Sequence, residues 1–463
     1  MKILVCARIG LDGEINPFDA CAYELALSVK DAEVCLLSMG PESNKNMLSS
    51  LTRLGAKIAF LLSDPAFAGA DTLATAYTLS LAVKIIKPDY IFCGRQTLIG
   101  DTAQTGVMLS YNVGFNLITN VMGISHITED TVSCKTRDEG DMTVSSPALL
   151  TVERINTLRL PSIRSKVGEV KILSADDIKA DPQKCGLAGS PTRVIETKEN
   201  TSGRRKCEFI TFDRLDEIIK NSLNKTKQKT QNTHTEKKIS KVLCVTKAPI
   251  EYAKTVSDNI VFCDNNDVDA VIKSIKAENP DAVLFGSDSI SKRVSALIAA
   301  KLDLGLCADC TALQTDGETL YMIRPALSGS VIAKIKSLTK PAMATVRTNK
   351  NSSDIVVSVG YGAKNCIDSI KAFADRYGAQ LGASRKAVDN DILPYELQVG
   401  LTGKTVSPSV YIAIGISGAV HHIVGMDKSG TVIAINPDKD APIFDYADYG
   451  IIENFQNTFG GRL

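Results

Sequence analysis

The chain has no tryptophan, only four histidines and a net charge of +1 over 463 residues. So few histidines argue against histidine-rich metal chemistry, and the near-zero charge against bulk attraction to nucleic acid or an acidic membrane. No apolar run approaches the length of a membrane span. The N-terminus lacks the long apolar region and cleavage site of a signal peptide. We therefore expect a cytoplasmic protein of about three domains that opens with a β-strand.

The twelve cysteines are scattered along the chain rather than grouped. Several lie inside apolar runs, namely Cys6, Cys35, Cys93 and Cys244. This placement favours buried free thiols over disulfides. The pair at positions 307 and 310 has no second pair and no nearby histidine, so we predict no metal site.

One break in composition divides the chain. Residues 221–238 (NSLNKTKQKTQNTHTEKK) contain a single leucine among lysine, threonine, asparagine and glutamine. Such a stretch buries too little apolar surface to offset its ordering entropy, which predicts a flexible linker. On both sides, short apolar runs alternate with helix-like stretches, a pattern typical of α/β layers with mostly parallel strands.

Two blocks recur on either side of this break at nearly constant spacing. PDYIFCGRQT from Pro88 matches PDAVLFGSDS from Pro280, and PALLTVER from Pro147 matches PAMATVRT from Pro341. The recurrence predicts two copies of one α/β domain. Residues 348–463 have no counterpart in the first half and form a third module.

The third module holds strand-like runs that end in small or polar residues, at 354–362, 409–418 and 431–438. Ligands bind at the carboxyl ends of strands in an open parallel sheet. After the second run, GISG places Gly415 and Gly418 where the backbone can approach a pyrophosphate. The alternative is a tight packing turn.

Further polar loops occur in the same module. GASRKAVD and LQVGLTGKTVSPS each contain polar side chains next to a probable strand. Such loops, held by a rigid sheet, are where binding groups are usually found.

These motifs carry a family resemblance. GASRKAVD, QVGLTGKTVSPSVYIAIGISGAVHH and AINPDKDAPIFDYADYG resemble the FAD-binding domain of the alpha subunit of electron transfer flavoproteins. GLCADCTAL, IRPALSGSVIA and KPAMATVR resemble the alpha subunit's N-terminal domain, and NPFDACAYELAL, GADTLATAYTL and CGRQTLIGDTAQTG resemble the beta subunit. The resemblance implies a fusion of both subunits in one chain, with the beta-like half first.

The resemblance also implies the fold class and the domain order. We expect two related parallel-sheet α/β domains and a C-terminal Rossmann-like FAD-binding α/β domain. The boundaries follow: a beta-like domain at 1–220, the linker at 221–238, an alpha-like N-terminal domain at 239–347 and the FAD-binding domain at 348–463. The second of these domains is short, and we expect it to lack its first strands.

Residue roles follow from the motif match. Arg385 should lie over the flavin ring, where a cation stabilises anionic reduced states. His422 should donate to the flavin O2 region, and Thr402 should face N5. The remaining FAD-binding positions that we predict are Ser384, Gln398, Val399, Gly400, Gly415, Ser417, Gly418, His421, Asn436 and Asn454.

Four positions depart from the family pattern. Tyr361 replaces a phosphate-binding arginine, and Leu401 replaces a glutamine in QVGQTG. His421 replaces a glutamine, and Asn454 replaces an aspartate near the adenosine. These changes bear on FAD affinity and on the flavin potential.

The beta-like half should hold a second nucleotide. GDTAQTG follows the strand YIFCG and opens a helix-like run, an arrangement suited to phosphate, although an ordinary N-cap uses the same residues. The resemblance implies AMP or a second FAD here. The predicted nucleotide-binding residues of this half are Cys6, Asn16, Asp101, Ala103, Gln104 and Thr105.

Three functions remain open at this point. The first is an electron carrier that serves flavin dehydrogenases of the acyl-CoA dehydrogenase type, as in fatty acid β-oxidation. The second is an electron-bifurcating oxidoreductase with two FAD, which oxidises NADH and reduces ferredoxin or flavodoxin. The third is a nucleotide-binding protein without redox function. For the carrier, the resemblance places the dehydrogenase anchor at Ile163, in RLPSIRSKVGEV; packing beneath this loop is the alternative.

Overall fold

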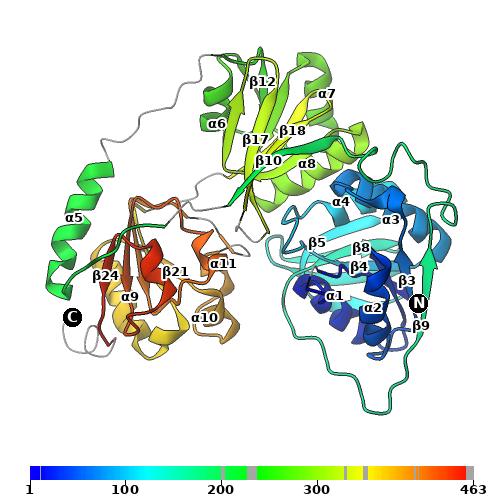
Figure 1. The fold of residues 1–463 in the computed structure, drawn as a ribbon, viewed down its shortest axis with the longest axis horizontal. Coiled ribbons are helices and arrows are strands. Elements are labelled where there is room, and N and C mark those ends of the chain that lie inside the picture. Colours follow the sequence, from blue (N-terminus) through cyan, green and yellow to red (C-terminus); the bar gives the residue numbers. More distant parts are fainter. Residues whose placement is uncertain are drawn as a thin grey trace. The chain divides into compact units, whose positions relative to one another are not determined.

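The structure is a computed structural model, and it describes residues 1–10, 12–199, 204–226, 237–327, 331–347, 353–400, 403–404 and 406–454. The chain divides into two compact units (Figure 1). The first unit comprises Met1–Thr197, Thr235–Leu327 and Ala333–Val346. The second unit comprises Lys198–His234, Ser328–Ile332 and Arg347–Leu463.

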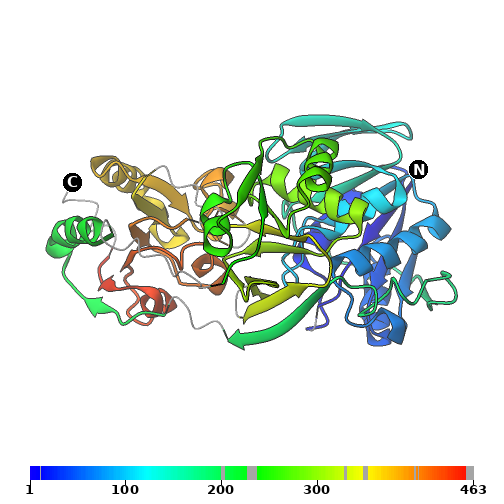
Figure 2. The ribbon, with the colours of Figure 1, turned by 90° about the horizontal axis from the view of Figure 1, so that it is seen from above.

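The N-terminal domain of the first unit is built on a nine-stranded sheet of order β7-β6-β5-β8-β4-β1-β2-β3-β9. Strands β5 to β7 form an antiparallel edge (cyan in Figure 2), and the other pairs are parallel. The strands are β1 (Lys2–Cys6), β2 (Glu33–Met39), β3 (Ile58–Leu62), β4 (Tyr90–Gly94), β5 (Asn116–Ile127), β6 (Thr131–Thr136), β7 (Asp141–Ser145), β8 (Ala148–Val152) and β9 (Glu169–Leu173). The helices are α1 (Pro17–Leu27), α2 (Lys45–Thr52), α3 (Thr72–Ile86) and α4 (Thr105–Val113).

Alternation along the strands sends apolar side chains to both faces of this sheet. Ile3 and Val5 pack with α1 and α2 on one face. Leu4 packs with α3 and α4 on the other face. Because both faces are covered by helices, the central strands are apolar throughout rather than alternating with polar residues.

The second domain of the first unit repeats this plan. Its parallel sheet has the order β13-β12-β14-β19-β15. Its elements are β12 (Val242–Val245), α6 (Ile250–Val256), β13 (Ile260–Cys263), α7 (Val268–Glu278), β14 (Ala282–Phe285), α8 (Ser289–Leu302), β15 (Leu306–Cys310) and β19 (Ala342–Val346). The repeated sequence blocks fall on β4 and β14 and on β8 and β19, which occupy equivalent places in the two sheets.

This domain is shorter than the N-terminal one, but the strand that it lacks is not one of those that we expected to be missing. Strands β12 and β13 precede β14 and occupy the places of β1 and β2, so the first strands are present. Among the described residues, the sheet instead has no counterpart of β3 beyond β13. A small four-stranded sheet completes the region, with β10 (Thr192–Glu199), β18 (Val331–Ser337), β17 (Leu320–Ala326) and β16 (Ala312–Thr315) in that order.

The second unit contains a six-stranded sheet of order β11-β24-β23-β22-β20-β21, in which every pair is parallel. Its strands are β11 (Glu208–Phe209), β20 (Ile355–Val359), β21 (Gln380–Ala383), β22 (Val410–Ile414), β23 (Thr431–Ile435) and β24 (Tyr449–Ile451). Its helices are α5 (Leu215–Thr226), α9 (Ile367–Arg376), α10 (Arg385–Asp389) and α11 (Val420–Ile423). Two parallel sheets and one mainly parallel sheet, each in an α/β domain, confirm the predicted fold class.

Helix α5 enters the range that we predicted to be a linker. It runs to Thr226 because Leu215, Ile218 and Ile219 are buried in the core of the second unit. Residues 227–236, the rest of the predicted linker apart from 237–238, lie outside the described residues. The domain boundaries stay a prediction, but residues from Lys198 onward group with the C-terminal module.

Candidate functional site

The strand order reverses at β20, because β21 lies on one side of it and β22, the next strand in sequence, lies on the other. Ligands of open α/β sheets bind at such a switch point, outside the carboxyl ends of the strands. The two loops at this point are in close contact, since Gly360 N donates to Ile414 O at 2.7 Å. A Cβ on Gly360 would lie 1.9 Å from the carbonyl oxygen of Gly415, so only glycine permits this approach.

The GISG turn after β22 also requires its glycines. Gly415 and Gly418 have φ of +66° and +93°, and a Cβ on Gly418 would lie 2.2 Å from Ile443 N. Asn436 holds the turn, because its Nδ2 donates to Ile416 O at 3.0 Å. Ser417 is exposed beside it. The turn therefore presents backbone and a hydroxyl at the switch point, as a pyrophosphate site requires.

Ser384 and Arg385 follow β21, which lies next to β20 in the sheet. Ser384 caps α10 by accepting from Ala387 N at 3.3 Å. Arg385 is half-buried, and its Nε pairs with Asp389 at 3.1 Å. The structure thus brings the predicted cation to the same edge of the sheet as the GISG turn.

The start of the QVGLTG motif, residues 398–400, packs against α11. Gln398 and Val399 are buried, and a Cβ on Gly400 would lie 2.7 Å from His421 O. Thr402 and Leu401 lie outside the described residues, so their roles remain predictions.

The two adjacent histidines have different environments. His421 is exposed, whereas His422 is 6% exposed with Nε2 2.8 Å from Tyr411 Oη. Burial lowers the pKa of His422 to about 4, so the ring is neutral near pH 7. Nε2 is engaged inside the domain, and Nδ1 is buried as well. Asn454, the last predicted residue of this site, is exposed at the end of the described chain.

Two lysines near the switch point were missed by sequence reasoning. Their ammonium groups lie over the ring of Tyr361, Lys364 at 4.6 Å and Lys386 at 4.9 Å from its centroid. Lys364 also donates to Tyr361 Oη at 3.1 Å, and this bond lowers the pKa of the phenol. The position that lost an arginine therefore keeps positive charge around it. In the sequence, the three-residue spacing between Tyr361 and Lys364 was the signal that could have indicated this contact.

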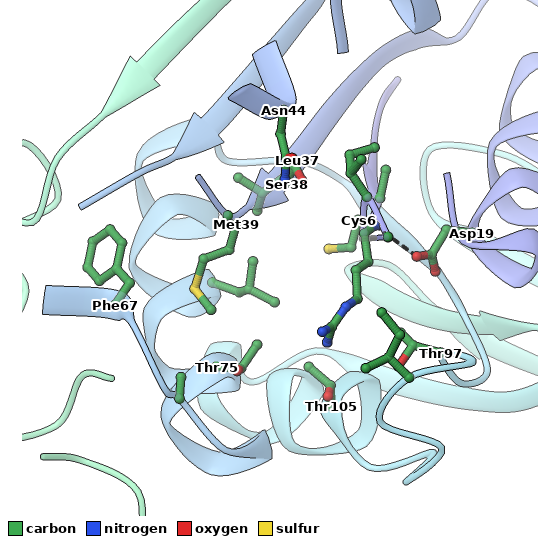
Figure 3. A pocket seen from close by; sticks show the side chains of 18 of the residues that line it. Cys6, Asp19, Leu37, Ser38, Met39, Asn44, Phe67, Thr75, Thr97 and Thr105 are labelled. Atoms are coloured by element: carbon green, nitrogen blue, oxygen red, sulfur yellow. Dashed lines mark hydrogen bonds between the residues drawn. The ribbon is translucent and has the colours of Figure 1, made fainter. Parts of the chain in front are cut away.

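A second site lies in the N-terminal domain, where a cavity of about 1370 Å³ opens at the carboxyl ends of β1, β2 and β4 (Figure 3). Strand order reverses here between β1 and β4, so this is again a switch point. Cys6, Ala103, Gln104 and Thr105 line the cavity, as predicted for the second nucleotide.

Asn16 and Asp101 are not among the residues that line the cavity. Asn16 instead bonds the backbone of the loop after β4, donating to Gln96 O at 3.0 Å. Asp101 accepts from the Gln96 side chain at 2.7 Å. Both side chains therefore stabilise this loop by hydrogen bonds instead of lining the cavity.

Four buried polar atoms of residues that line the cavity have no hydrogen-bond partner among the described residues: Ser38 Oγ, Arg95 Nε and Nη2, and Gln104 Nε2. The amide oxygen of Gln104 accepts from Thr72 at 3.0 Å, but its amide nitrogen is unused. Buried polar groups are nearly always paired in native proteins. The wall therefore fits a polar ligand such as a nucleotide.

Asp19 also lines the cavity and was missed. Its carboxylate accepts from Arg8 N and Gly94 N, each at 2.8 Å, and so ties the ends of β1 and β4 together (Figure 3). Burial raises its pKa to about 6. Arg95 follows β4 directly and Ser38 is the penultimate residue of β2, so the strand-end rule applied to the third module was the signal for both.

Fold and sites together define an α/β protein with two sheet switch points, one of which opens into a large cavity. Comparison with known families places residues 3–178 and 264–368 in the electron transfer flavoprotein domain, and residues 350–427 in the electron transfer flavoprotein FAD-binding domain. The chain belongs to the electron transfer flavoprotein family.

Relatives of both subunits match the chain. The electron transfer flavoprotein subunit alpha of Thermoanaerobacterium thermosaccharolyticum is 37% identical over 230 residues, 40% of this chain and 70% of the relative. The subunit beta of the same organism is 36% identical over 225 residues, 46% of this chain and 86% of the relative. Protein FixB of Azotobacter vinelandii is 34% identical over 234 residues, 40% of this chain and 65% of the relative. These matches are consistent with a beta-like part followed by an alpha-like part in one chain.

Among the helices of the described residues, none is both long and apolar enough to cross a membrane.

Proposed function

We propose that the chain carries electrons on an FAD held in its C-terminal domain, taking them from flavin dehydrogenases of the acyl-CoA dehydrogenase type. The main support is the match of residues 350–427 to the family's FAD-binding domain, at a switch point where a tight glycine turn follows β22. Bound FAD would supply the redox chemistry.

The chain's own residues would bind and orient the cofactor. The GISG turn and Ser384 would hold the pyrophosphate, with Asn436 fixing the turn from behind. Arg385 would place a cation beside the ring, and in a partly desolvated site that cation favours added negative charge. The neutral His422 would offer a ring nitrogen without bringing a second charge.

The cavity in the beta-like half would hold a second adenine nucleotide, either AMP or FAD. Its volume of about 1370 Å³ exceeds the roughly 300–1,000 Å³ of ordinary small-ligand pockets. The size favours the larger ligand and keeps the bifurcating alternative open. In that alternative the protein would oxidise NADH and pass electrons to ferredoxin or flavodoxin.

Dehydrogenase docking would use the loop between β8 and β9. Ile163 is 98% exposed and Leu160 beside it is 89% exposed, which supports the anchor over packing beneath the loop. Arg159 ties the start of this loop to Glu24, with its Nη2 2.7 Å from the carboxylate. An apolar tip next to charged groups suits a transient, electrostatically steered contact.

Counting the cofactors released from purified full-length protein tests these alternatives. One FAD and one AMP per chain is expected for the carrier. Two FAD would favour bifurcation. Purified protein without flavin would contradict both the carrier and the bifurcating function. It would favour the third alternative, a nucleotide-binding protein without redox chemistry, which the replacements at Tyr361 and Leu401 suggest.

A further inference from the structure

A row of buried charges lies behind the cavity of the N-terminal domain. Arg95 Nε lies 3.0 Å from Glu153 Oε1, and Arg137 Nη1 lies 2.7 Å from the same oxygen. The side chains of Arg95 and Glu153 are 9% and 2% exposed, and that of Arg137 is 19% exposed. Two guanidinium groups thus share one carboxylate oxygen in a place that water barely reaches.

The row continues into the neighbouring domain of the same unit. Arg137 Nη2 contacts Ser289 Oγ at 3.4 Å, and Asp138 beside it accepts from the same hydroxyl and from Asn120. Ser289 is the first residue of α8. The turn between β6 and β7 is therefore fixed against the start of α8, and this fixes Arg137 in turn.

The ion pair with Glu153 does not use every hydrogen-bond donor of the Arg95 guanidinium group. Its Nη2 is buried without a hydrogen-bond partner among the described residues, although the side chain lines the cavity. A buried N–H group without a partner costs free energy. The nearby carboxylate of Asp19 does not relieve it, because that group accepts from the backbone of Arg8 and Gly94.

Charge neutralisation alone does not account for Arg95. Glu153 already has a closer cation in Arg137, so a second arginine is not needed to balance it. Arg95 lines the cavity together with Gln104 and Ser38, whose Nε2 and Oγ are also buried without a hydrogen-bond partner among the described residues. The three residues come from different segments of the domain: Ser38 from β2, Arg95 from the loop after β4 and Gln104 from the start of α4.

We propose that Arg95 is an anion ligand of this cavity and that Glu153, held by Arg137, is the residue that positions it. The anion is a phosphate or pyrophosphate of an adenine nucleotide, since a guanidinium binds phosphate oxygens strongly. This inference rests on the proposed nucleotide site. Within that site, it identifies Arg95 as the side chain that binds the negative charge of the ligand.

The test compares ADP with adenosine by titration calorimetry on the full-length chain after bound nucleotide has been exchanged out. We expect wild type to prefer ADP. Arg95→Gln should weaken ADP binding at least about tenfold, the scale of a charge-assisted hydrogen bond, and leave adenosine binding unchanged. Arg95→Lys keeps the charge and should recover part of the loss.

The positioning role is tested through Arg137→Gln and Glu153→Gln. Arg137 is partly exposed and does not line the cavity, so its variant should fold even if the Glu153 variant does not. We expect Arg137→Gln to weaken ADP binding without affecting adenosine, a split that a merely structural defect would not produce. Arg214→Gln is the matched control, because Arg214 pairs with Glu208 at 3.2 Å in the other unit.

The outcomes separate this inference from the proposed function. If wild type binds neither ligand, the second nucleotide site itself is refuted, and this inference with it. If wild type prefers ADP and Arg95→Gln keeps that preference, only the role of Arg95 is overturned. If Arg137→Gln and Glu153→Gln both bind ADP like wild type, the positioning role is overturned.

Discussion

Tyr411 Oη lies 2.8 Å from Nε2 of His422 inside the C-terminal domain, and the two rings stand at 55° to one another. Tyr411 is fully buried on β22 and His422 is 6% exposed on α11. Burial raises the pKa of the phenol and lowers that of the imidazole, so both groups are neutral near pH 7. The pair ties α11 to the central strand of the switch point.

This pair makes stability depend on pH. The pKa of His422 falls from 6.5 to about 4 on folding, so between these values the unfolded chain binds more protons than the folded one. Its contribution is fully present above pH 6.5 and is lost as the pH falls through about 4, at most about 3 kcal/mol. His422→Gln should therefore flatten the fall in unfolding free energy over this range, measured as urea midpoints by circular dichroism.

The exposed neighbour supplies the control for that experiment. His421→Gln removes a histidine from the same helix without removing a buried one, so its pH profile should match that of wild type. A profile for His422→Gln as steep as that of wild type would contradict the assignment of the acid sensitivity to this residue.

The docking loop gives a second prediction. Ile163→Ala should cost roughly 1–3 kcal/mol of binding to a cognate acyl-CoA dehydrogenase if the side chain fills a pocket. Flavin content and melting temperature should not change, because Ile163 is 98% exposed. Steady-state electron transfer against carrier concentration gives the apparent affinity. Leu187, 57% exposed in the same domain, supplies the control Leu187→Ala, and equal affinity in both variants would rule out the anchor.

Arg385 gives a third prediction, about the flavin potential. Arg385→Ala should lower the reduction potential of bound FAD by roughly 20–30 mV, since a screened charge at close range contributes about 1 kcal/mol and 30 mV corresponds to about 1.4 kcal/mol for two electrons. Spectroelectrochemical titration measures the shift. Arg376→Ala removes an arginine from the exposed face of α9 and should leave the potential unchanged. An unchanged potential in both variants would count against a place over the ring.

A fourth prediction concerns the covalent connection between the halves. Because α5 runs to Thr226 and its apolar residues belong to the core of the second unit, the chain should be divided after this helix. Co-expressed residues 1–226 and 238–463 should associate and retain flavin, as two separate subunits would. Gel filtration with absorbance at the flavin band measures this. Failure of the halves to associate under any condition would show that the connection is required.

The local pattern of the sequence was enough to predict the two repeated domains. The blocks that begin at Pro88 and Pro280 contain β4 and β14, and the blocks that begin at Pro147 and Pro341 contain β8 and β19. Buried parallel strands are continuous apolar runs whose character is visible within five or six residues. The GISG glycines were also visible, because a tight turn after a strand needs residues that accept positive φ.

Which side chains enter a cavity was decided by contacts far apart in sequence. Asn16 and Asp101 belong to the right loops, yet their side chains hold those loops, while Arg95 and Ser38 line the wall. That choice depends on strand order and on the path of each loop, and neither is encoded within a short window.

The sequence by itself determined the elements of this protein, their repetition and the turns that need glycine, because these depend on interactions between near neighbours. Only the tertiary structure decided that α5 joins the C-terminal core and that Glu153 is shared by Arg95 and Arg137. The apolar spacing of Leu215, Ile218 and Ile219 specifies a buried face but not the domain that buries it. A buried carboxylate likewise needs cations or hydrogen-bond donors, but which of them reach it depends on how the sheet brings distant strands together.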